Sequence, residues 1–416
     1  MIKETLMLQK REIERKLKEP YVERLAKALK INDPLIKVII GPRRAGKSFF
    51  ALHYLSKGET FGYVNFDDEK LVELKSYDEL IAELDVLYGN PKTLFFDEIQ
   101  NLSKWELFVN RLQRQGRNLV LTGSNSNLLS KELATHLTGR HTPINILTFS
   151  FKEFLEHEKI ELTSSEIKAK LDKYLTFGGY PEPLMKNLDY KEYISTLFDS
   201  IIYKDIIKRH SIRSSKGMED LAFYLLANIS NEYSYNSLTK IANLASSHTT
   251  EKYMSYLEES FIFFSLKRFS NKAKEQVSSN KKIYNFDNGM IYAKAFKMNP
   301  DFGKIYENVV AQELKRDEMD KKCELFYWKN QQQEEVDFVV KENLKIKKLI
   351  QVCYKLDKPE TKDREVRALL KAGKELKCKD LLVITSDYEG EENVKWFDLQ
   401  GDIKFIPLWK FLVRDK

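Results

Sequence analysis

Short apolar runs alternate with longer amphipathic segments over the first 150 residues of the chain. The segments repeat their apolar positions every three to four residues, which is typical of helices packed on one face. The runs are rich in β-branched and aromatic residues and fall at 35–40, 61–66, 93–96, 118–122 and 144–147. Strands that alternate with helices predict a parallel sheet with helices on both faces. Such sheets carry their functional groups at the carboxyl ends of the strands.

The pattern changes beyond residue 150. A helical region is interrupted at Gly178-Gly-Tyr-Pro181, and three short helices then precede a strand at 261–266. A mixed α/β pattern occupies the remainder of the chain. We therefore predict five parts: a helical segment 1–31, an α/β core 32–150, a helical lid or linker 151–217, a winged-helix-like module 218–272 and an α/β domain 273–416.

Composition favours a globular protein of several domains. Hydrophobic residues make up 42% of the 416 positions and charged residues 31%, with both signs mixed. No apolar run reaches the length of a membrane span, and the N-terminus lacks an apolar signal core. Three widely spaced cysteines (Cys323, Cys353, Cys378) form neither a metal pattern nor a disulfide framework. We expect a cytoplasmic protein with no membrane partner.

The net charge of +7 is spread over the chain. Its sharpest basic cluster is the segment 204–216, which holds five Lys and Arg residues against the single acid Asp205. A mildly basic balance permits nucleic-acid binding. Lysine-rich surfaces also serve solubility alone, so both interpretations of the charge stay open.

Residues 41–48 read Gly-Pro-Arg-Arg-Ala-Gly-Lys-Ser, a full match to the phosphate-binding loop G-x-x-x-x-G-K-[ST] between a strand and a helix. The glycines let backbone N–H groups cradle phosphates, and the helix N-terminus adds a favourable dipole. Lys47 should reach the β- and γ-phosphates of ATP, and Ser48 should bind Mg²⁺. Arg43 and Arg44 either contact phosphate or face solvent. The predicted nucleotide-binding residues are Gly41, Pro42, Arg43, Arg44, Ala45, Gly46, Lys47, Ser48 and Phe49.

A second motif follows the third apolar run. Thr93-Leu-Phe-Phe-Asp-Glu98 ends in two carboxylates at the edge of the predicted sheet. Asp97 should bind the Mg²⁺ ion, and Glu98 should orient and deprotonate the attacking water. The alternative is that these are two solvated carboxylates at a strand end with no role in catalysis. The phosphate-binding loop upstream favours the catalytic role.

Two further positions are candidates for the catalytic site. Ser124, with Asn125 beside it, follows the fourth strand, where a polar side chain can touch both the γ-phosphate and the water; a plain turn is the alternative. Arg140 is a candidate arginine finger that could act on the ATP of a neighbouring subunit, or a surface ion-pair partner.

The motifs occur in a defined order along the chain: 41–48, 95–100, Trp105, 122–126, 139–140 and 149–154, followed by 178–181, 287–289 and 335–338. This order resembles that of the prokaryotic AAA-type ATPases of the AAA+ superfamily that carry a C-terminal domain of unknown function. The resemblance covers nearly the whole chain. It implies ATP hydrolysis and a P-loop, AAA+-like parallel sheet core. It does not indicate which process the energy of ATP hydrolysis drives.

The region 218–269 resembles a winged helix. Leu221, Leu225 and Ile229 form one apolar face, and the third helix, 250–259, would be the recognition helix. That helix carries three Glu residues against Lys252 alone. A winged helix used only for packing or self-assembly is therefore an equal alternative. DNA contact through the basic cluster or through Lys267-Arg268 stays open.

The C-terminal segment resembles the restriction-endonuclease-like fold. Glu307 on a helix, Asp337 ending a strand and Gln351-Val-Cys353 on the next strand occupy the positions of two acids and an acid/Gln-x-Lys motif. In that arrangement the acids hold a metal and the lysine helps to position the water. Cys353 replaces the lysine here, and Lys355 lies two residues further along the same face. We therefore expect a binding or assembly platform without nuclease activity.

Two functions fit these features. One is a Mg²⁺-dependent ATPase that couples ATP binding and hydrolysis to the binding or remodelling of DNA, including branched or forked DNA. The other is a nucleotide-gated protein-interaction switch with no nucleic-acid substrate. In both we expect a homo-oligomer, since Arg140 would complete a neighbour's site.

Overall fold

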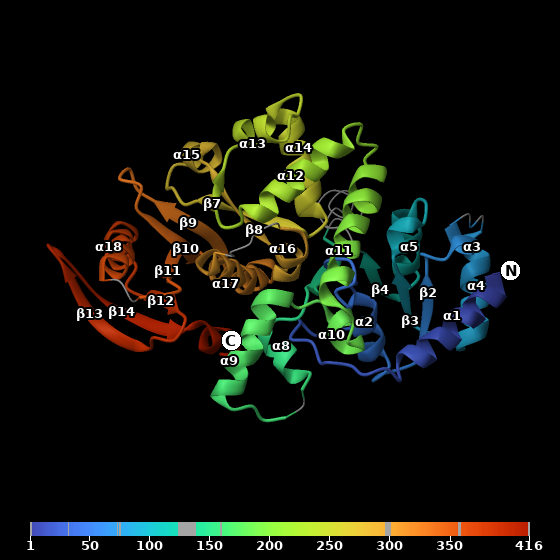
Figure 1. The fold of residues 1–416 in the computed structure, drawn as a ribbon. Coiled ribbons are helices and arrows are strands. Elements are labelled where there is room, and N and C mark those ends of the chain that lie inside the picture. The colour runs from blue at the N-terminus through green and yellow to red at the C-terminus, as the bar shows by residue number, and fades with distance from the viewer. Residues whose placement is uncertain are drawn as a thin grey trace. The chain divides into compact units, whose positions relative to one another are not determined.

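The computed structural model describes residues 2–31, 33–72, 74, 76–123, 139–158, 160–295, 301–356 and 359–414. The chain divides into two compact units, residues 1–148 and residues 149–416, apart from the short segment 259–261. Each unit is built on its own sheet, with five strands in the first and nine in the second (Figure 1).

The first unit contains the predicted parallel sheet. Its strands lie in the order β2-β3-β4-β1-β5, and all neighbours are parallel. The strands are β1 (Ile36–Ile40), β2 (Phe61–Asn65), β3 (Thr93–Asp97), β4 (Asn118–Gly123) and β5 (His141–Asn145). Four agree with the apolar runs to within one residue. Edge strand β5 begins three residues before its predicted start, because only Ile144 of its side chains is buried and the backbone pairing with β1 defines its limits.

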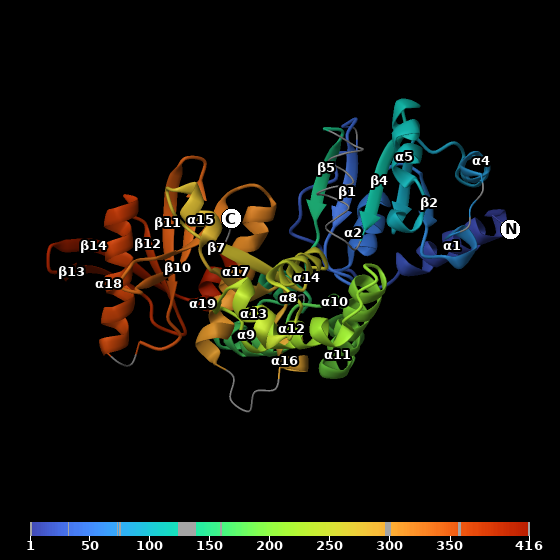
Figure 2. The ribbon, with the colours of Figure 1, turned by 90° about the horizontal axis from the view of Figure 1, so that it is seen from above.

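Helices cover this sheet, and α2 is the helix predicted to follow the phosphate-binding loop. It packs against β1 and β4, while α5 packs against β4 (Figure 2). Helix α1 ends at Lys16 rather than continuing to residue 31, because Pro20 disfavours a helical conformation in the residue before it. The helices are α1 (Ile2–Lys16), α2 (Lys47–Leu55), α3 (Glu69–Val72), α4 (Tyr77–Tyr88), η1 (Ile99–Asn101) and α5 (Trp105–Arg114).

The second unit opens with the predicted helical region, comprising α8 (Phe151–Glu156), α9 (Ser164–Phe177), α10 (Pro181–Lys186), α11 (Tyr190–Ser200) and the π-helix η2 (Ile201–Lys208). Capping boxes at Ser150 and Thr163 start α8 and α9. The break at Gly178-Gly179 has a packing cause. The Gly179 amide donates to Asp287 Oδ2 at 2.9 Å, and a Cβ on Gly178 would come within 1.8 Å of Asp287 Oδ1.

Three helices and three strands follow: α12 (Ser215–Ala227), β6 (Glu232–Tyr233), α13 (Tyr235–Ile241), α14 (Ser247–Glu259), β7 (Phe263–Arg268) and β8 (Lys281–Asn285). The short helix α15 (Ala273–Ser278) lies between β7 and β8. Strand β8 pairs antiparallel with both β7 and β6. The predicted boundary at 272–273 therefore falls inside the β7–β8 hairpin.

The predicted C-terminal α/β domain continues the same sheet, since β7 pairs in parallel with β9. The sheet order is β13-β14-β12-β11-β10-β9-β7-β8-β6. The remaining elements are α16 (Asn288–Lys294), α17 (Phe302–Met319), β9 (Glu324–Lys329), β10 (Glu335–Glu342), β11 (Lys345–Val352), α18 (Pro359–Leu376), β12 (Leu381–Thr385), β13 (Gly390–Trp396), β14 (Leu399–Pro407) and α19 (Leu408–Val413). Across the described residues, no helix combines the length and apolarity needed to span a membrane.

Candidate active site and family

The loop between β1 and α2 has the backbone of a tight anion-binding turn. Gly41 has φ +152°, Arg44 φ +64° and Gly46 φ +90°. A Cβ on Gly41 would lie 1.8 Å from the carbonyl oxygen of Ile146, so only glycine fits there. Lys47 is buried, and its ammonium donates to the carbonyls of Gly41 at 3.1 Å and Pro42 at 2.8 Å. Lys47 thus lies across the loop that the sequence predicts to bind phosphate.

Asp97, at the end of β3, faces the start of α2. Its Oδ1 accepts a hydrogen bond from Ser48 Oγ at 2.8 Å, and its Oδ2 accepts one from Tyr63 at 3.1 Å. Burial raises the pKa of Asp97, and Glu98 adds to this, while hydrogen bonds from Thr122, Ser48 and Tyr63 oppose the shift. Hydroxyl and carboxylate oxygens are the hard donors that Mg²⁺ prefers, so this adjacent pair fits a magnesium ion.

Glu98 adopts a left-handed backbone conformation with φ +51°, which is uncommon for a residue with a side chain. Its backbone amide donates to Thr122 Oγ1 at 3.0 Å. Its side-chain Oε2 accepts a hydrogen bond from the side-chain amide of Gln100. These contacts hold the half-buried carboxylate at the edge of the sheet beside Asp97.

Three side chains at this site were not predicted from sequence: Tyr63, Gln100 and Thr122. Thr122 links the two acids, because its hydroxyl donates to Asp97 and accepts from the amide of Glu98. Gln100 and Thr122 lie inside the motifs 95–100 and 122–126, so the sequence offered a signal that could have identified them as site residues. Tyr63 comes from β2, a strand with no motif of its own, and only the sheet order brings it to Asp97.

The structure places the other predicted site residues as follows. Ser124 and Asn125 lie outside the described residues. Arg140 is exposed and precedes β5, with its carbonyl accepting from the amide of Ile36. Arg44 is exposed and Arg43 half-buried, while the Phe49 ring lies 5.2 Å from that of His53.

The acids of the endonuclease-like centre surround a lysine. The buried Lys282 ammonium lies 2.7 Å from Glu307 Oε1, 2.6 Å from Glu335 Oε1 and 3.1 Å from Asp337 Oδ1. Tyr284 also donates to Glu307, at 2.6 Å. Burial alone would lower the pKa of Lys282, but these acidic groups together raise it well above its usual value. Lys282 thus supplies the positive charge at the point where the fold resemblance suggested a metal.

The remaining residues of that centre are engaged in other contacts. Gln351 donates to Glu365 at 2.6 Å, and Asp337 lies within β10 rather than at its end. Burial raises the pKa of the Cys353 thiol to about 11, with Glu365 adding to the shift. Lys355 Nζ lies over the ring of Tyr354. Within the described part of the chain, no group of three or more His, Cys, Asp or Glu side chains could hold a metal ion.

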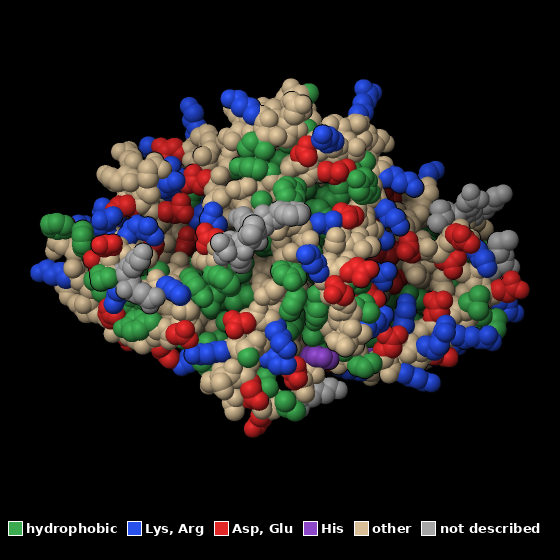
Figure 3. All heavy atoms as spheres, in the orientation of Figure 1, with side chains coloured by type: hydrophobic (Ala, Val, Ile, Leu, Met, Phe, Trp, Pro, Cys, Tyr) green, Lys and Arg blue, Asp and Glu red, His purple; other side chains and the backbone are tan. Residues whose placement is uncertain are grey.

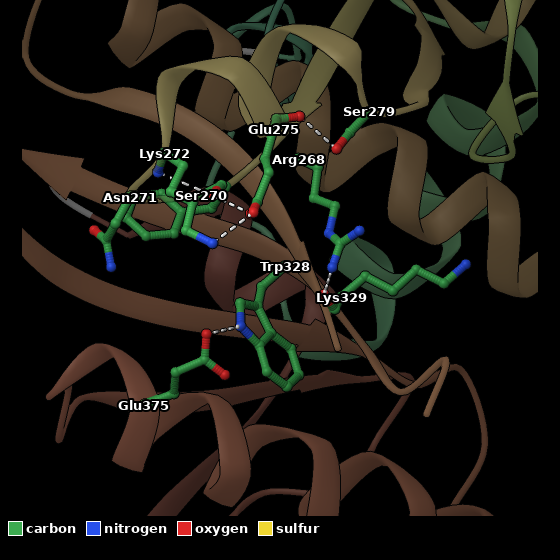
Figure 4. Close-up of a pocket in the computed structure, with 10 residues that line it drawn as sticks. Arg268, Ser270, Asn271, Lys272, Glu275, Ser279, Trp328, Lys329 and Glu375 are labelled. Carbon is green, nitrogen blue, oxygen red and sulfur yellow. Dashed lines mark hydrogen bonds and ion pairs between the residues drawn. The ribbon is translucent and has the colours of Figure 1, made fainter. Parts of the chain in front are cut away.

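A pocket of about 220 Å³ lies elsewhere in the second unit, between the β7–β8 connection, β9 and α18 (Figure 4). Its polar groups interact with one another. Lys272 pairs with Glu275 at 2.9 Å, Trp328 donates to Glu375 at 3.2 Å, and Arg268 donates to the Lys329 carbonyl. We assign no ligand to this pocket.

Comparison with known families accounts for most of the chain. A model described as an AAA domain matches residues 33–155. Two models of domains of unknown function, DUF8612 and DUF4143, match residues 168–301 and 302–411.

Two relatives are similar to this chain over most of its length. An uncharacterized protein of Methanocaldococcus jannaschii is 38% identical over 400 residues, covering 90% of this chain and 88% of the relative. An uncharacterized protein of Haemophilus influenzae is 32% identical, covering 68% and 74%. Among solved structures, the Walker-type ATPase of Pyrococcus abyssi is similar at 16% identity with a TM-score of 0.44, covering 68% of this chain and 94% of that one. The chain therefore belongs to the AAA-type ATPases that carry C-terminal domains of unknown function.

Proposed function

We propose that the chain is a Mg²⁺-dependent ATPase, and the observation that carries the proposal is the 2.8 Å contact between Ser48 and Asp97 beside the phosphate loop. In this proposal Ser48 and Asp97 hold the Mg²⁺ ion, which would neutralise charge developing on the phosphates. Lys47 exchanges its two loop carbonyls for oxygens of the β- and γ-phosphates. That exchange replaces neutral acceptors with anionic ones, which form stronger hydrogen bonds.

Glu98 is the proposed general base. Its carboxylate is oriented by Gln100, and its backbone is held by Thr122, so it can accept a proton from water without first reorganising. Thr122 and Tyr63 keep Asp97 fixed, and the hydroxyl of Ser48 would be a second ligand for the metal. Ser124 and Arg140 stay proposals for the γ-phosphate contact and for a neighbour's site. Comparing the mass in solution with and without ATP would decide whether an oligomer forms.

Lys47→Ala should weaken ATP binding by at least ~10-fold for each charge-assisted bond that it removes. The measurement is titration with a slowly hydrolysed ATP analogue and Mg²⁺. Lys57→Ala is a matched control, because this exposed lysine follows the same helix and pairs with Glu23 at 3.2 Å. Equal affinities of the Lys47 and Lys57 variants for ATP would contradict the proposed site.

We further propose that nucleotide turnover is coupled to DNA binding by the second unit, and the basic segment 204–216 supports this. Lys204, Lys208, Arg209, Arg213 and Lys216 are all exposed. Among the described residues, none of these five takes part in an ion pair. Acidic and basic side chains are interspersed over the face in Figure 3.

Contacts place the basic segment beside the predicted recognition helix. The His210 ring stacks on Tyr256 of α14, with ring centroids 3.7 Å apart. Burial lowers the pKa of His210, and the charges of Arg209 and Lys252 add to the shift, so Lys252 on α14 joins the same basic surface. The π-helix η2 carries Lys204 and Lys208, and π-helical turns often mark functional sites.

Replacing Lys208, Arg209 and Arg213 together by alanine should weaken binding to duplex and forked DNA and lower its salt dependence. Each lost phosphate contact should reduce the slope of log affinity against log salt by about 0.9. A triple variant of Lys345, Lys347 and Lys379, all exposed, controls for the loss of three charges. Absence of DNA binding in the wild-type protein, with ATPase activity present, would favour the nucleotide-gated protein-interaction switch.

The proposal includes no nuclease activity in the C-terminal domain. Lys282 neutralises the acids that would hold a metal, and the Cys353 thiol stays protonated near neutral pH. Cleavage of plasmid or four-way DNA with Mg²⁺ or Mn²⁺ that is lost in Asp337→Ala would contradict this part of the proposal.

A further inference from the structure

The segment after α1 contacts the phosphate loop and α2 without forming a helix or strand. The ring of Tyr21 stacks on His53 of α2, with centroids 4.1 Å apart and planes within 9°. Three residues later, Arg24 is 8% exposed, which is rare for an arginine. Residues 21–24 therefore pack on the helix that begins in the loop and bury a cation beside it.

Arg24 joins two backbone carbonyls that are far apart in sequence. Its Nη1 donates to Ala45, inside the phosphate loop, at 2.8 Å, and its Nη2 donates to Leu147 at 2.5 Å. The first residue of the loop meets the same segment, because a Cβ on Gly41 would lie 1.8 Å from the Ile146 oxygen. Both ends of the loop are thus held against residues 146–147.

The bond to Ala45 has a consequence for the next amide. In a planar trans peptide, the carbonyl of one residue and the N–H of the next point in opposite directions. With the Ala45 carbonyl turned toward Arg24, the Gly46 N–H is turned away from it. The amides of such loops are the groups that bind phosphate oxygens, so an arginine outside the motif sets the direction of a donor inside it.

We propose that Arg24 is a positioning residue for nucleotide binding, which keeps the phosphate loop in its anion-binding conformation before ATP arrives. The inference rests on the proposed ATP site and adds a residue upstream of every recognised motif. Arginine suits the role because its planar fork offers two donors at fixed geometry and stays charged when buried. Lysine carries the charge without the fork, so it should not substitute.

The test compares Arg24→Met, Arg24→Lys and Arg24→Gln with Arg15→Met, an exposed arginine on α1. The readouts are the Kd for an ATP analogue with Mg²⁺, kcat and KM for ATP, and Tm. Arg24→Met should raise Kd and KM by about 10-fold or more, the loss expected for a hydrogen bond made by a charged group. We expect kcat to change by less than about threefold, since Arg24 touches no reacting atom.

The three substitutions separate positioning from folding. Arg24→Lys should bind nucleotide as poorly as Arg24→Met, whereas Arg24→Gln keeps one amide donor for Ala45 and should recover part of the affinity. A lower Tm with unchanged Kd and KM in Arg24→Gln and Arg24→Lys would overturn the inference and leave a structural role. If the wild-type and Arg15→Met proteins do not bind the analogue, the proposed ATP site itself fails.

Discussion

Replacing Glu98 with glutamine is expected to lower ATP turnover by ~10²–10⁴-fold, the usual contribution of a general base. Glutamine keeps the shape of the side chain but cannot accept a proton from water. ATP should still bind, because Lys47, Ser48 and Asp97 are unchanged. Steady-state phosphate release and analogue binding measure the two effects separately.

The Glu98 experiment needs a control that changes one charge on the same unit. Glu79→Gln serves, since Glu79 lies exposed on α4. Wild-type turnover in Glu98→Gln would assign the base to another residue. Loss of nucleotide binding together with turnover would instead indicate that Glu98 supports the loop, and the strained backbone at this position would then be structural.

Lys282→Met should destabilise the second unit by about 3–5 kcal/mol, the usual cost of leaving buried charges without their partner. Glu307, Glu335 and Asp337 all pair with this ammonium, and burial raises the pKa of Glu307 to about 8, with Asp337 adding to the shift. The stability lost in Lys282→Met should shrink as pH falls, because removing the ammonium raises the pKa of these buried carboxyls further, so that they give up their unpaired charge at a higher pH than in the wild-type protein. Urea unfolding at several pH values measures it.

Two companion variants show whether charge causes the loss. Lys281→Met removes the neighbouring lysine, which donates to the hydroxyl of Tyr235 instead, and should have a much smaller effect. Adding Glu307→Gln and Asp337→Asn to Lys282→Met should restore part of the stability, because the buried acids no longer need a cation. A loss in the triple variant equal to that in Lys282→Met would show that the hydrogen bonds and packing of Lys282, rather than the unpaired charges of the acids, cause the destabilisation.

Local sequence determined the elements that form the proposed nucleotide site. An apolar run followed by glycine, lysine and serine specifies β1, the loop and α2, since turn chemistry and helix start signals act within a few residues. The same holds for the residues 95–98 at the end of β3, and comparison with relatives agrees on the family that these motifs indicate. No individual strand was predicted at β6, β8, β13 or β14. In β13 alternate positions are polar and exposed, so the strand gives no apolar run.

Tertiary structure alone decided which distant side chains meet. The sheet order brings Tyr63 and Thr122 to Asp97. In the second unit, the order β10-β9-β7-β8 and the packing of α17 against β8 bring Lys282 to Asp337 and Glu307. Arg24 reaches Ala45 and Leu147 across 21 and 123 residues of chain. Periodicity records which face of an element is buried, but it carries no information on which other element covers that face. These contacts depend on chain topology, and no local pattern encodes them.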